Sequence, residues 1–248
     1  MEKKIPHVAL VIKTARSYGR GLLRGVRRYN AEHGPWSVYM ELRALDSRPP
    51  SWLKHWRGDG ILVRTGDKAI TDAVNAAALP TVELRSSRLM KGLPFVGADN
   101  QTIGQLVMEH FLERGFRHFG VYGMDSEDYF KERCDNFMDE VMKAGYECFV
   151  YRQHGRREKP ADWERQQQDV SNWAMSLPKP IGVMACTDQL GFWFLDACRR
   201  ADISVPEEVA VVGCENDESL TTMSAPPLSS VHFQTEKTYY RKIRLDSL

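Results

Sequence analysis

The sequence lacks the motifs of a metal site. Its five cysteines are widely spaced, form no CxxC pair and do not cluster with histidine at the spacing of zinc ligands. The seven histidines form neither an HExxH nor an HxxxH pair. We therefore expect reduced, mostly buried cysteines, no bound metal and no cofactor.

Long apolar runs and an excess of one charge are also missing. No stretch approaches the roughly 18 apolar residues of a membrane span. The run VALVI near the N-terminus is too short for a signal-peptide core, and Lys13 and Arg16 follow where a cleavage site would stand. We therefore expect a cytoplasmic chain with no membrane partner.

The charge balance argues against a nucleic-acid surface in this chain. The formal net charge is +1, from 34 lysines and arginines and 33 acidic residues. The one basic tract, residues 152–159, is interpreted as a solvated loop, because a nucleic-acid surface gathers more positive charge on one face. We expect no DNA-binding domain in this chain.

What the 248 residues do contain is a regular alternation of short apolar runs with amphipathic segments of helix length. Strands are expected at 7–12, 36–42, 60–64, 81–84, 95–98, 118–123, 147–151, 181–186 and 209–214. Helices are expected near 18–33, 67–78, 101–114, 129–144, 162–177 and 188–201. Continuous apolar strands between helices indicate parallel sheets covered on both faces, so the predicted fold class is α/β and doubly wound.

The alternation divides into two similar halves. Five strands precede residue 98, and a second series of strands and helices begins near His118. We expect an N-terminal subdomain over 1–117, a C-terminal subdomain over 118–231, and a short final segment, 232–248, that crosses back to the first. Because ligands bind at the carboxyl ends of parallel strands, the expected site is a cleft between two sets of strand ends.

Polar side chains follow the predicted strands in both halves, and they are mixed in sign. The candidate ligand-binding residues are Arg16, Tyr18, Arg64, Asp99, Arg133, Thr187, Asp188, Glu215 and Asn216. A carboxylate or amide beside an arginine can hold neighbouring sugar hydroxyls, and an aromatic ring can pack against the apolar face of a sugar. Structural roles are the alternative: helix capping for Asp99, solvated loop charges for Arg16 and Arg64, and a helix-dipole partner for Asp188.

A dinucleotide site is the competing interpretation of the first strand-helix turn. Gly19 and Gly21 begin the glycine fingerprint, and Glu41 lies about 20 residues downstream, where a ribose-binding carboxylate is expected. Arg24 replaces the third glycine, and no nucleophile with a partnered base is visible. We expect a protein that is not an enzyme. The alternatives kept open are a sugar-binding protein without regulatory role and an NAD(P)-dependent enzyme.

Three stretches resemble the effector-binding region of the lactose/galactose repressor family. They are VGADNQTIGQLVMEHFLERGFRHFGVYG at 96–123, CTDQLGFWFLDACRRADISVPEEVAVVGCENDE at 186–218 and APPLSSV at 225–231. The motifs WRGDGILV, ERCDNF and CTDQLG, with IKTARSYGRG near the start, are similar to one branch, the bacterial xylose operon regulators. Those regulators begin with the sugar-binding region and carry an arabinose-regulator-type DNA-binding domain after it.

The resemblance implies a periplasmic-binding-protein-like type I fold and a sugar effector, xylose or a related pentose. It also implies a homodimer that contacts operator DNA through a C-terminal domain missing from this chain. The family's ligand contacts fall on Tyr18, Arg133, Asp188, Glu215 and Asn216.

The sequence departs from the family pattern at several of these positions. Thr187 stands where many members have asparagine, Glu215 where aspartate is usual, and Arg64 where the xylose regulators have an acidic residue. After residue 236 the family continues with a full helix and a final strand, for which the remaining residues are too few.

Overall fold

A computed structural model describes residues 5–41, 49–64, 68–84, 92–125, 128–154 and 160–233. The described residues form two compact units, within residues 1–98 and 99–233. The segment expected to cross back falls almost wholly on residues 234–248, which lie outside the described residues.

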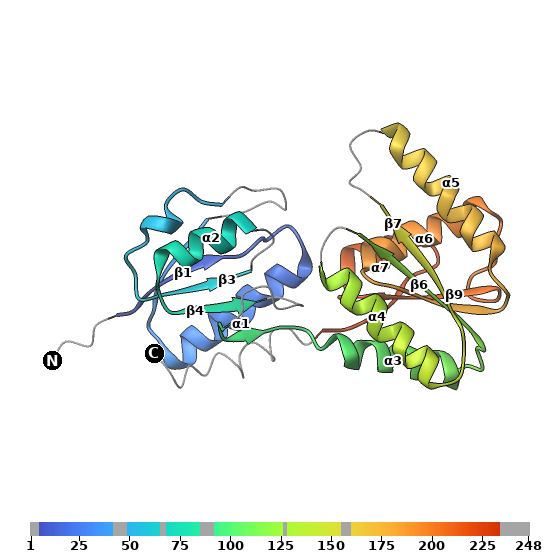
Figure 1. The fold of residues 1–248 in the computed structure, drawn as a ribbon, viewed down its shortest axis with the longest axis horizontal. Helices are drawn as coiled ribbons and strands as arrows, with labels where there is room; N and C mark the ends of the chain where they lie inside the picture. Colours follow the sequence, from blue (N-terminus) through green and yellow to red (C-terminus); the bar gives the residue numbers. More distant parts are fainter. Residues whose placement is uncertain are drawn as a thin grey trace. The chain divides into compact units, whose positions relative to one another are not determined.

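The first unit is built on a parallel sheet with the spatial order β2-β1-β3-β4-β5 (Figure 1). Its strands are β1 (His7–Val11), β2 (Ser37–Met40), β3 (Gly60–Val63), β4 (Thr81–Leu84) and β5 (Phe95–Val96). Helix α1 (Ser17–His33) and helix α2 (Lys68–Ala77) cover opposite faces of this sheet, and a short 3-10 turn, Leu53–His55, packs beside α2.

Alternation along the strands decides which side chains face each helix layer. Ala9 and Val11 of β1 and Val63 of β3 belong to one buried cluster with Ile70 and Val74 of α2. The opposite face is covered by α1, which buries Leu22 and Val26. Strand β2 lies at the sheet edge with all four residues exposed. Of the strand expected at 36–42, the structure forms Ser37–Met40, the four residues that pair with β1, and residue 42 lies outside the described residues.

The second unit repeats the topology of the first. Its sheet has the order β10-β9-β8-β6-β7, in which the unit's first strand again lies between its second and its third. The strands are β6 (His118–Met124), β7 (Cys148–Gln153), β8 (Ile181–Ala185), β9 (Val209–Cys214) and β10 (Ser229–Val231). The helices are α3 (Asn100–Glu113), α4 (Asp128–Lys143), α5 (Pro160–Ser176), α6 (Asp188–Arg200) and α7 (Glu218–Met223). In Figure 1, α3 and α4 lie on one face of the sheet and α5 and α6 on the other.

The core of the second unit contains a cluster of aromatic rings. The ring centroid of Phe111 on α3 lies 6.5 Å from those of both Phe119 and Phe137, and all three side chains are fully buried. Gly182 of β8 lets the Phe111 ring approach the sheet, since a Cβ at that position would lie 2.6 Å from the ring. Such tight contacts leave little free volume for larger side chains.

The boundary between the two units lies after residue 98, whereas the sequence led us to expect it after residue 117. Helix α3 belongs with the second unit because it packs closely on α4: a Cβ on Gly104 would lie 3.1 Å from backbone atoms of Asn136 and Phe137. Leu106 of α3 is 49% exposed. Helix α7 and strand β10 were not expected from the sequence.

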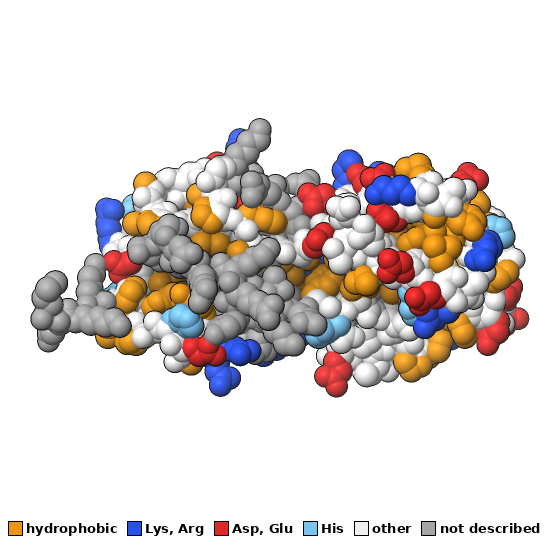
Figure 2. Space-filling model, turned by 90° about the horizontal axis from the view of Figure 1, so that it is seen from below, with side chains coloured by type: hydrophobic (Ala, Val, Ile, Leu, Met, Phe, Trp, Pro, Cys, Tyr) orange, Lys and Arg blue, Asp and Glu red, His pale blue; other side chains and the backbone are white. Residues whose placement is uncertain are grey.

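On the face shown in Figure 2, acidic and basic side chains of the second unit are interspersed, and hydrophobic side chains reach the surface between them. Exposed apolar side chains on this unit include Leu106, Met142 and Met175. Scattered exposure of this kind is ordinary for folded proteins. Among the described helices, none has the length and hydropathy needed to cross a bilayer.

Candidate functional site

The two sheets place the candidate residues at equivalent points. In each sheet the unit's first strand lies between its second and its third strand, so the strand order reverses beside the first strand. Open parallel sheets bind ligands at the carboxyl ends of the strands at this point, which is called the switch point. Tyr18 follows β1 and Arg64 follows β3 in the first unit. Arg133 on α4 follows β6, and Thr187 follows β8, in the second unit. Each unit therefore offers an arginine at its switch point.

In the first unit the structure brings Tyr18 and Arg64 together. The guanidinium carbon of Arg64 lies 5.3 Å from the centroid of the Tyr18 ring, and the two residues are only 8% and 4% exposed. Arg64 is held there because its backbone N–H donates to the carbonyl of Val11 at the end of β1. Its Nε has no hydrogen-bond partner among the described residues. Arg16 is the N-cap residue of α1 and makes no side-chain capping bond.

In the second unit Arg133 is the centre of a buried polar network. Its side chain is fully buried; Nε donates to Oδ1 of Asn100 at 3.1 Å, and Nη1 donates to the carbonyl of Cys186 at 2.6 Å. Nη1 also lies 3.4 Å from Oε1 of Glu215. The guanidinium carbon is 5.0 Å from the Tyr129 ring centroid and 4.9 Å from that of Phe233. These contacts fix the plane of the guanidinium group.

Electrostatics keep Arg133 charged in this setting. Burial is the largest single effect and lowers the pKa of Arg133, but the combined electrostatic effect of Glu215, Cys214, Tyr129 and Cys186 outweighs it, so the pKa is raised above its ordinary value. Nη2 of Arg133 is buried and has no hydrogen-bond partner among the described residues. A buried guanidinium nitrogen without an acceptor is costly, so this atom is suited to donate to a bound ligand.

Glu215 and Asn216 form a strained turn at the end of β9. Their φ angles are 105° and 51°, in the left-handed region that side-chain-bearing residues rarely adopt. The turn is held because the Glu215 N–H donates to the carbonyl of Val231, and the Asn216 N–H donates to the hydroxyl of Ser230. Strain of this kind persists where the surrounding structure imposes it and is frequent at binding sites. It directs the Glu215 carboxylate toward Arg133.

Asp188 has both carboxylate oxygens engaged within the second unit. Oδ2 accepts from the backbone N–H of Asp217 at 2.6 Å, and Oδ1 accepts from the Ser230 hydroxyl at 2.5 Å. Burial is the main reason that the pKa of Asp188 is raised to about 7, and the negative charge of Glu215 raises this pKa further. The hydrogen bonds from Ser230 and Asp217 act in the opposite direction and lower the pKa. Asp188 therefore ties the β9-α7 turn to β10.

Two further candidates act as helix caps. The Asp99 carboxylate accepts from the N–H groups of Gln101 and Thr102, so the structural alternative for this residue is present. The Thr187 hydroxyl accepts from the N–H of Leu190 at the start of α6, and Thr187 is buried.

Four side chains of the Arg133 network were not among the candidates. Asn100 donates to Oε2 of Glu132 at 2.9 Å while it accepts from Arg133. Tyr129 and Phe233 supply the rings beside the guanidinium group. Tyr129, Glu132 and Arg133 are three and four residues apart and therefore share one face of α4. This spacing is the sequence signal that could have identified Tyr129 and Glu132 as neighbours of Arg133.

The glycines of the first strand-helix turn have a packing role. A Cβ on Gly19 would lie 2.0 Å from the carbonyl oxygen of Lys13, so a larger residue would push α1 away from the end of β1. Glu41, the expected ribose ligand of a dinucleotide site, accepts a hydrogen bond from the Tyr39 hydroxyl at 3.0 Å on the edge strand. Within the described ranges, no group of three or more histidine, cysteine or acidic side chains could hold a metal ion.

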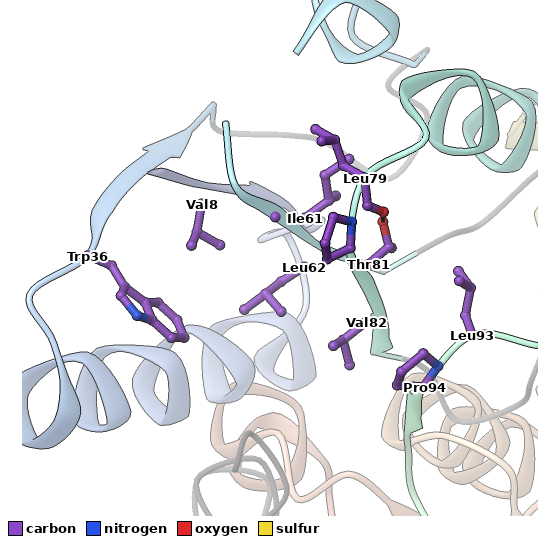
Figure 3. A pocket seen from close by; sticks show the side chains of 11 residues that line it. Val8, Trp36, Ile61, Leu62, Leu79, Thr81, Val82, Leu93 and Pro94 are labelled. Atoms are coloured by element: carbon purple, nitrogen blue, oxygen red, sulfur yellow. Dashed lines mark hydrogen bonds between the residues drawn. The ribbon is translucent and has the colours of Figure 1, made fainter. Parts of the chain in front are cut away.

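A cavity of about 230 Å³ in the first unit has a different character (Figure 3). It lies near the amino ends of β1, β3 and β4, away from the carboxyl edge, and Val8, Leu62 and Val82 point into it from the sheet while Trp36 closes one side. Apolar walls offer few partners for sugar hydroxyls, so we do not place the sugar there.

The fold defines a protein of two α/β units, each with candidate ligand contacts at the carboxyl edge of its parallel sheet. A family model described as the periplasmic binding protein-like domain matches residues 108–245. A second model, described as the XylR N-terminal domain, matches residues 7–101. The chain belongs to the periplasmic binding protein-like family.

Curated relatives include two proteins named xylose operon regulatory protein. The one from Haemophilus influenzae is 26% identical over 253 residues, and the one from Escherichia coli K12 is 28% identical over 255 residues. Each alignment covers 99% of this chain and 64% of the relative, so the chain spans less than two thirds of their length.

Solved structures agree on the fold. A structure titled xylose-binding transcription activator xylR superposes with a TM-score of 0.83 at 25% identity, over 99% of this chain and 63% of that one. A CelR-cellobiose complex gives 0.74 at 22% identity, over 96% of this chain and 76% of the other. A protein from Alkaliphilus metalliredigens, complexed with D-xylulofuranose, gives 0.71 at 16% identity, over 97% and 89%. The expectations of family and fold class are confirmed, and the named relatives are regulators, in agreement with the expectation that the chain is not an enzyme.

Proposed function

We propose that this chain is the sugar-sensing domain of a bacterial transcription regulator, and that its sugar-binding residues lie at the carboxyl edges of its sheets. The observation that carries the proposal is the buried Arg133, whose Nη2 lacks a hydrogen-bond partner among the described residues at the switch point of the second sheet. A ligand that supplies an acceptor there removes a desolvation cost that the chain otherwise bears.

The chemistry of this edge suits a sugar hydroxyl. A hydroxyl donates one hydrogen bond and accepts others, so it can accept from Arg133 while it donates to the nearby Glu215 carboxylate. Both bonds are charge-assisted and stronger than bonds between neutral groups. In the first unit the Tyr18 ring, with Arg64 beside it, offers an aromatic contact of the kind that sugar rings make.

Asp188 has a positioning role in this proposal. Its two oxygens are occupied by Asp217 and Ser230, so it acts on the ligand by holding the turn that carries Glu215. Thr187 contributes through the backbone of the β8-α6 connection, whose Cys186 carbonyl orients Arg133. Arg16, Asp99 and Asn216 remain candidate contacts at the rims of the two edges.

The names of the relatives favour a pentose. Two relatives are xylose operon regulators, one similar structure is described as xylose-binding, and another contains D-xylulofuranose. We infer that xylose or a related pentose is the first ligand to test. Regulation would require DNA contacts from a domain outside this chain, since the relatives are longer, and we infer a cytoplasmic homodimer by the same resemblance.

A sugar can signal only through a difference in affinity between two arrangements of the protein. If one arrangement offers the ligand more contacts than the other, the ligand stabilises that arrangement by the additional contacts. A further domain attached to the chain would then respond to the change.

A thermal-shift screen tests the proposal. The probes are pentoses, hexoses, their acid and phosphate derivatives, and NAD(P). They are measured with the wild-type chain, Glu215→Gln and the matched control Glu207→Gln, which alters an exposed carboxylate outside the site. A ligand at about 100 times its Kd stabilises the fold by roughly 2.7 kcal/mol. We expect one sugar to raise the Tm of the wild type and of Glu207→Gln, and to have little effect on Glu215→Gln. A shift with NAD(P) alone, or none with any sugar, would contradict the proposal.

A further inference from the structure

The two arginines at the switch points differ in how their charges are balanced. Arg133 has Glu215 at 3.4 Å, whereas no described carboxylate forms an ion pair with Arg64. Arg64 is nevertheless buried, with an exposed fraction of only 8%, and its Nε has no hydrogen-bond partner among the described residues. Its side chain contacts the Tyr18 ring. Because desolvation of a cation costs more than a ring contact returns, this ring does not by itself compensate Arg64.

The start of α1 adds a second cationic feature to the same edge. The helix has 17 residues, no acidic residue in its first turn, and no capping bond from the side chain of Arg16. The first turn itself therefore supplies no acidic side chain of the kind that commonly compensates the positive dipole end. The hydroxyl of Ser17, in the first turn, is also buried without a hydrogen-bond partner among the described residues. Because Tyr18 is the next residue, Arg64 lies beside this same turn.

These features together describe a place for a negative charge. A carboxylate or phosphate accepts from a guanidinium fork, from a hydroxyl and from backbone N–H groups at a helix start, and each bond is charge-assisted. The hydroxyls of a neutral sugar would satisfy the hydrogen-bonding atoms but leave the charge of Arg64 uncompensated. The second unit needs no such ligand group, because Glu215 already compensates Arg133.

We propose that the ligand of this chain is an anionic sugar derivative, whose acidic group is bound by Arg64, Ser17 and the first turn of α1. The inference rests on the proposed function, since it assigns the chemical class of the ligand at the same edges. A sugar carboxylate and a sugar phosphate share this chemistry, and the test separates them.

The experiment compares neutral and acidic sugars of the same carbon skeleton by calorimetric titration. The sets are xylose, xylonate and xylose phosphate, and glucose, gluconate, glucuronate and glucose phosphate. We expect one acidic member to bind at least about tenfold more tightly than its neutral counterpart, and its affinity to fall as salt is raised from about 50 to 500 mM. The member of the set that binds tells whether the group is a carboxylate or a phosphate.

Variants tie the preference to Arg64. Arg64→Gln should reduce the advantage of the acidic sugar about tenfold or more, and Arg64→Lys, which keeps the charge, should retain part of it. Arg57→Gln, an exposed arginine of the same unit, is the matched control and should bind as the wild type does. If Arg64→Gln fails to fold, the wild-type comparison of acidic and neutral sugars still decides the proposal.

The outcomes separate this inference from the proposed function. A neutral sugar that binds as tightly as its acidic partners overturns the anionic ligand and leaves the sugar-sensing function standing. An acidic preference that is unchanged in Arg64→Gln overturns the assignment to this edge. Failure of all neutral and acidic sugars to bind overturns the proposed function and this inference with it.

Discussion

The buried carboxyl of Asp188 gives a sharp prediction about pH. Substitution of Asp188 by asparagine keeps the shape of the protonated acid: Oδ1 can accept from the Asp217 N–H, and Nδ2 can donate to the Ser230 hydroxyl. The variant therefore retains the link between the β9-α7 turn and β10, but it cannot ionise. Any difference in pH dependence between it and the wild type reports on this one group.

The size of the difference follows from the two pKa values. The pKa of Asp188 is raised by burial to about 7 in the folded chain, against an ordinary value of 3.8. A raised acid pKa means that the folded state holds its proton while the unfolded state has lost it. Stability from this group is therefore full below about pH 4 and is lost as the pH rises through about 7. Each pH unit in this window changes the free energy of unfolding by about 1.4 kcal/mol.

The assay is urea unfolding at several pH values between about 5 and 8, for the wild type, Asp188→Asn and the control Asp169→Asn, which alters an exposed carboxylate of the same unit. Over this range we expect the wild type to lose about 3 kcal/mol relative to Asp188→Asn, with the slope ending near pH 7. The control should follow the wild type. A wild-type curve parallel to that of Asp188→Asn would show that the carboxyl titrates normally, and would refute the reasoning about its burial.

Two further predictions concern the second unit. Arg133→Met removes one partner of a buried ion pair and leaves the Cys186 carbonyl and the Glu215 carboxylate without their donor. The free energy of unfolding in urea should therefore fall by about 3–5 kcal/mol. A loss under about 1 kcal/mol would contradict the importance of this network. Gly182→Ala places a Cβ 2.6 Å from the Phe111 ring and should cost about 1–3 kcal/mol, part of which Phe111→Leu should restore in the double variant. Additive losses in that double variant would show that the two sites do not touch.

Much of the architecture is encoded locally. The runs at 7–12 and 209–214 are continuous apolar stretches between turn residues, and each becomes a central strand, β1 and β9. Helix α7 and strand β10 could not be found this way. The helix has six residues and the strand three, too few for a period, and β10 exists because the polar sequence Ser229–Val231 pairs with β9. Pairing between distant segments overrides a weak local preference.

The site was predictable in outline and not in detail. Its position follows from strand ends in a parallel sheet, which the sequence pattern indicates. The partners of Arg133 do not, because Asn100 is 33 residues away and Glu215 is 82 residues away in the sequence. The role of Asp188 also depended on Ser230, which belongs to the strand that the pattern did not reveal.

Calorimetric titration of the chosen sugar or sugar acid into the wild type, Arg64→Gln and Glu215→Gln is the most direct test that the carboxyl edges of the sheets carry the binding residues. We expect the affinity to fall in both variants, because each alters the carboxyl edge of a sheet. Wild-type affinity in either variant would contradict the assignment of binding residues to that edge.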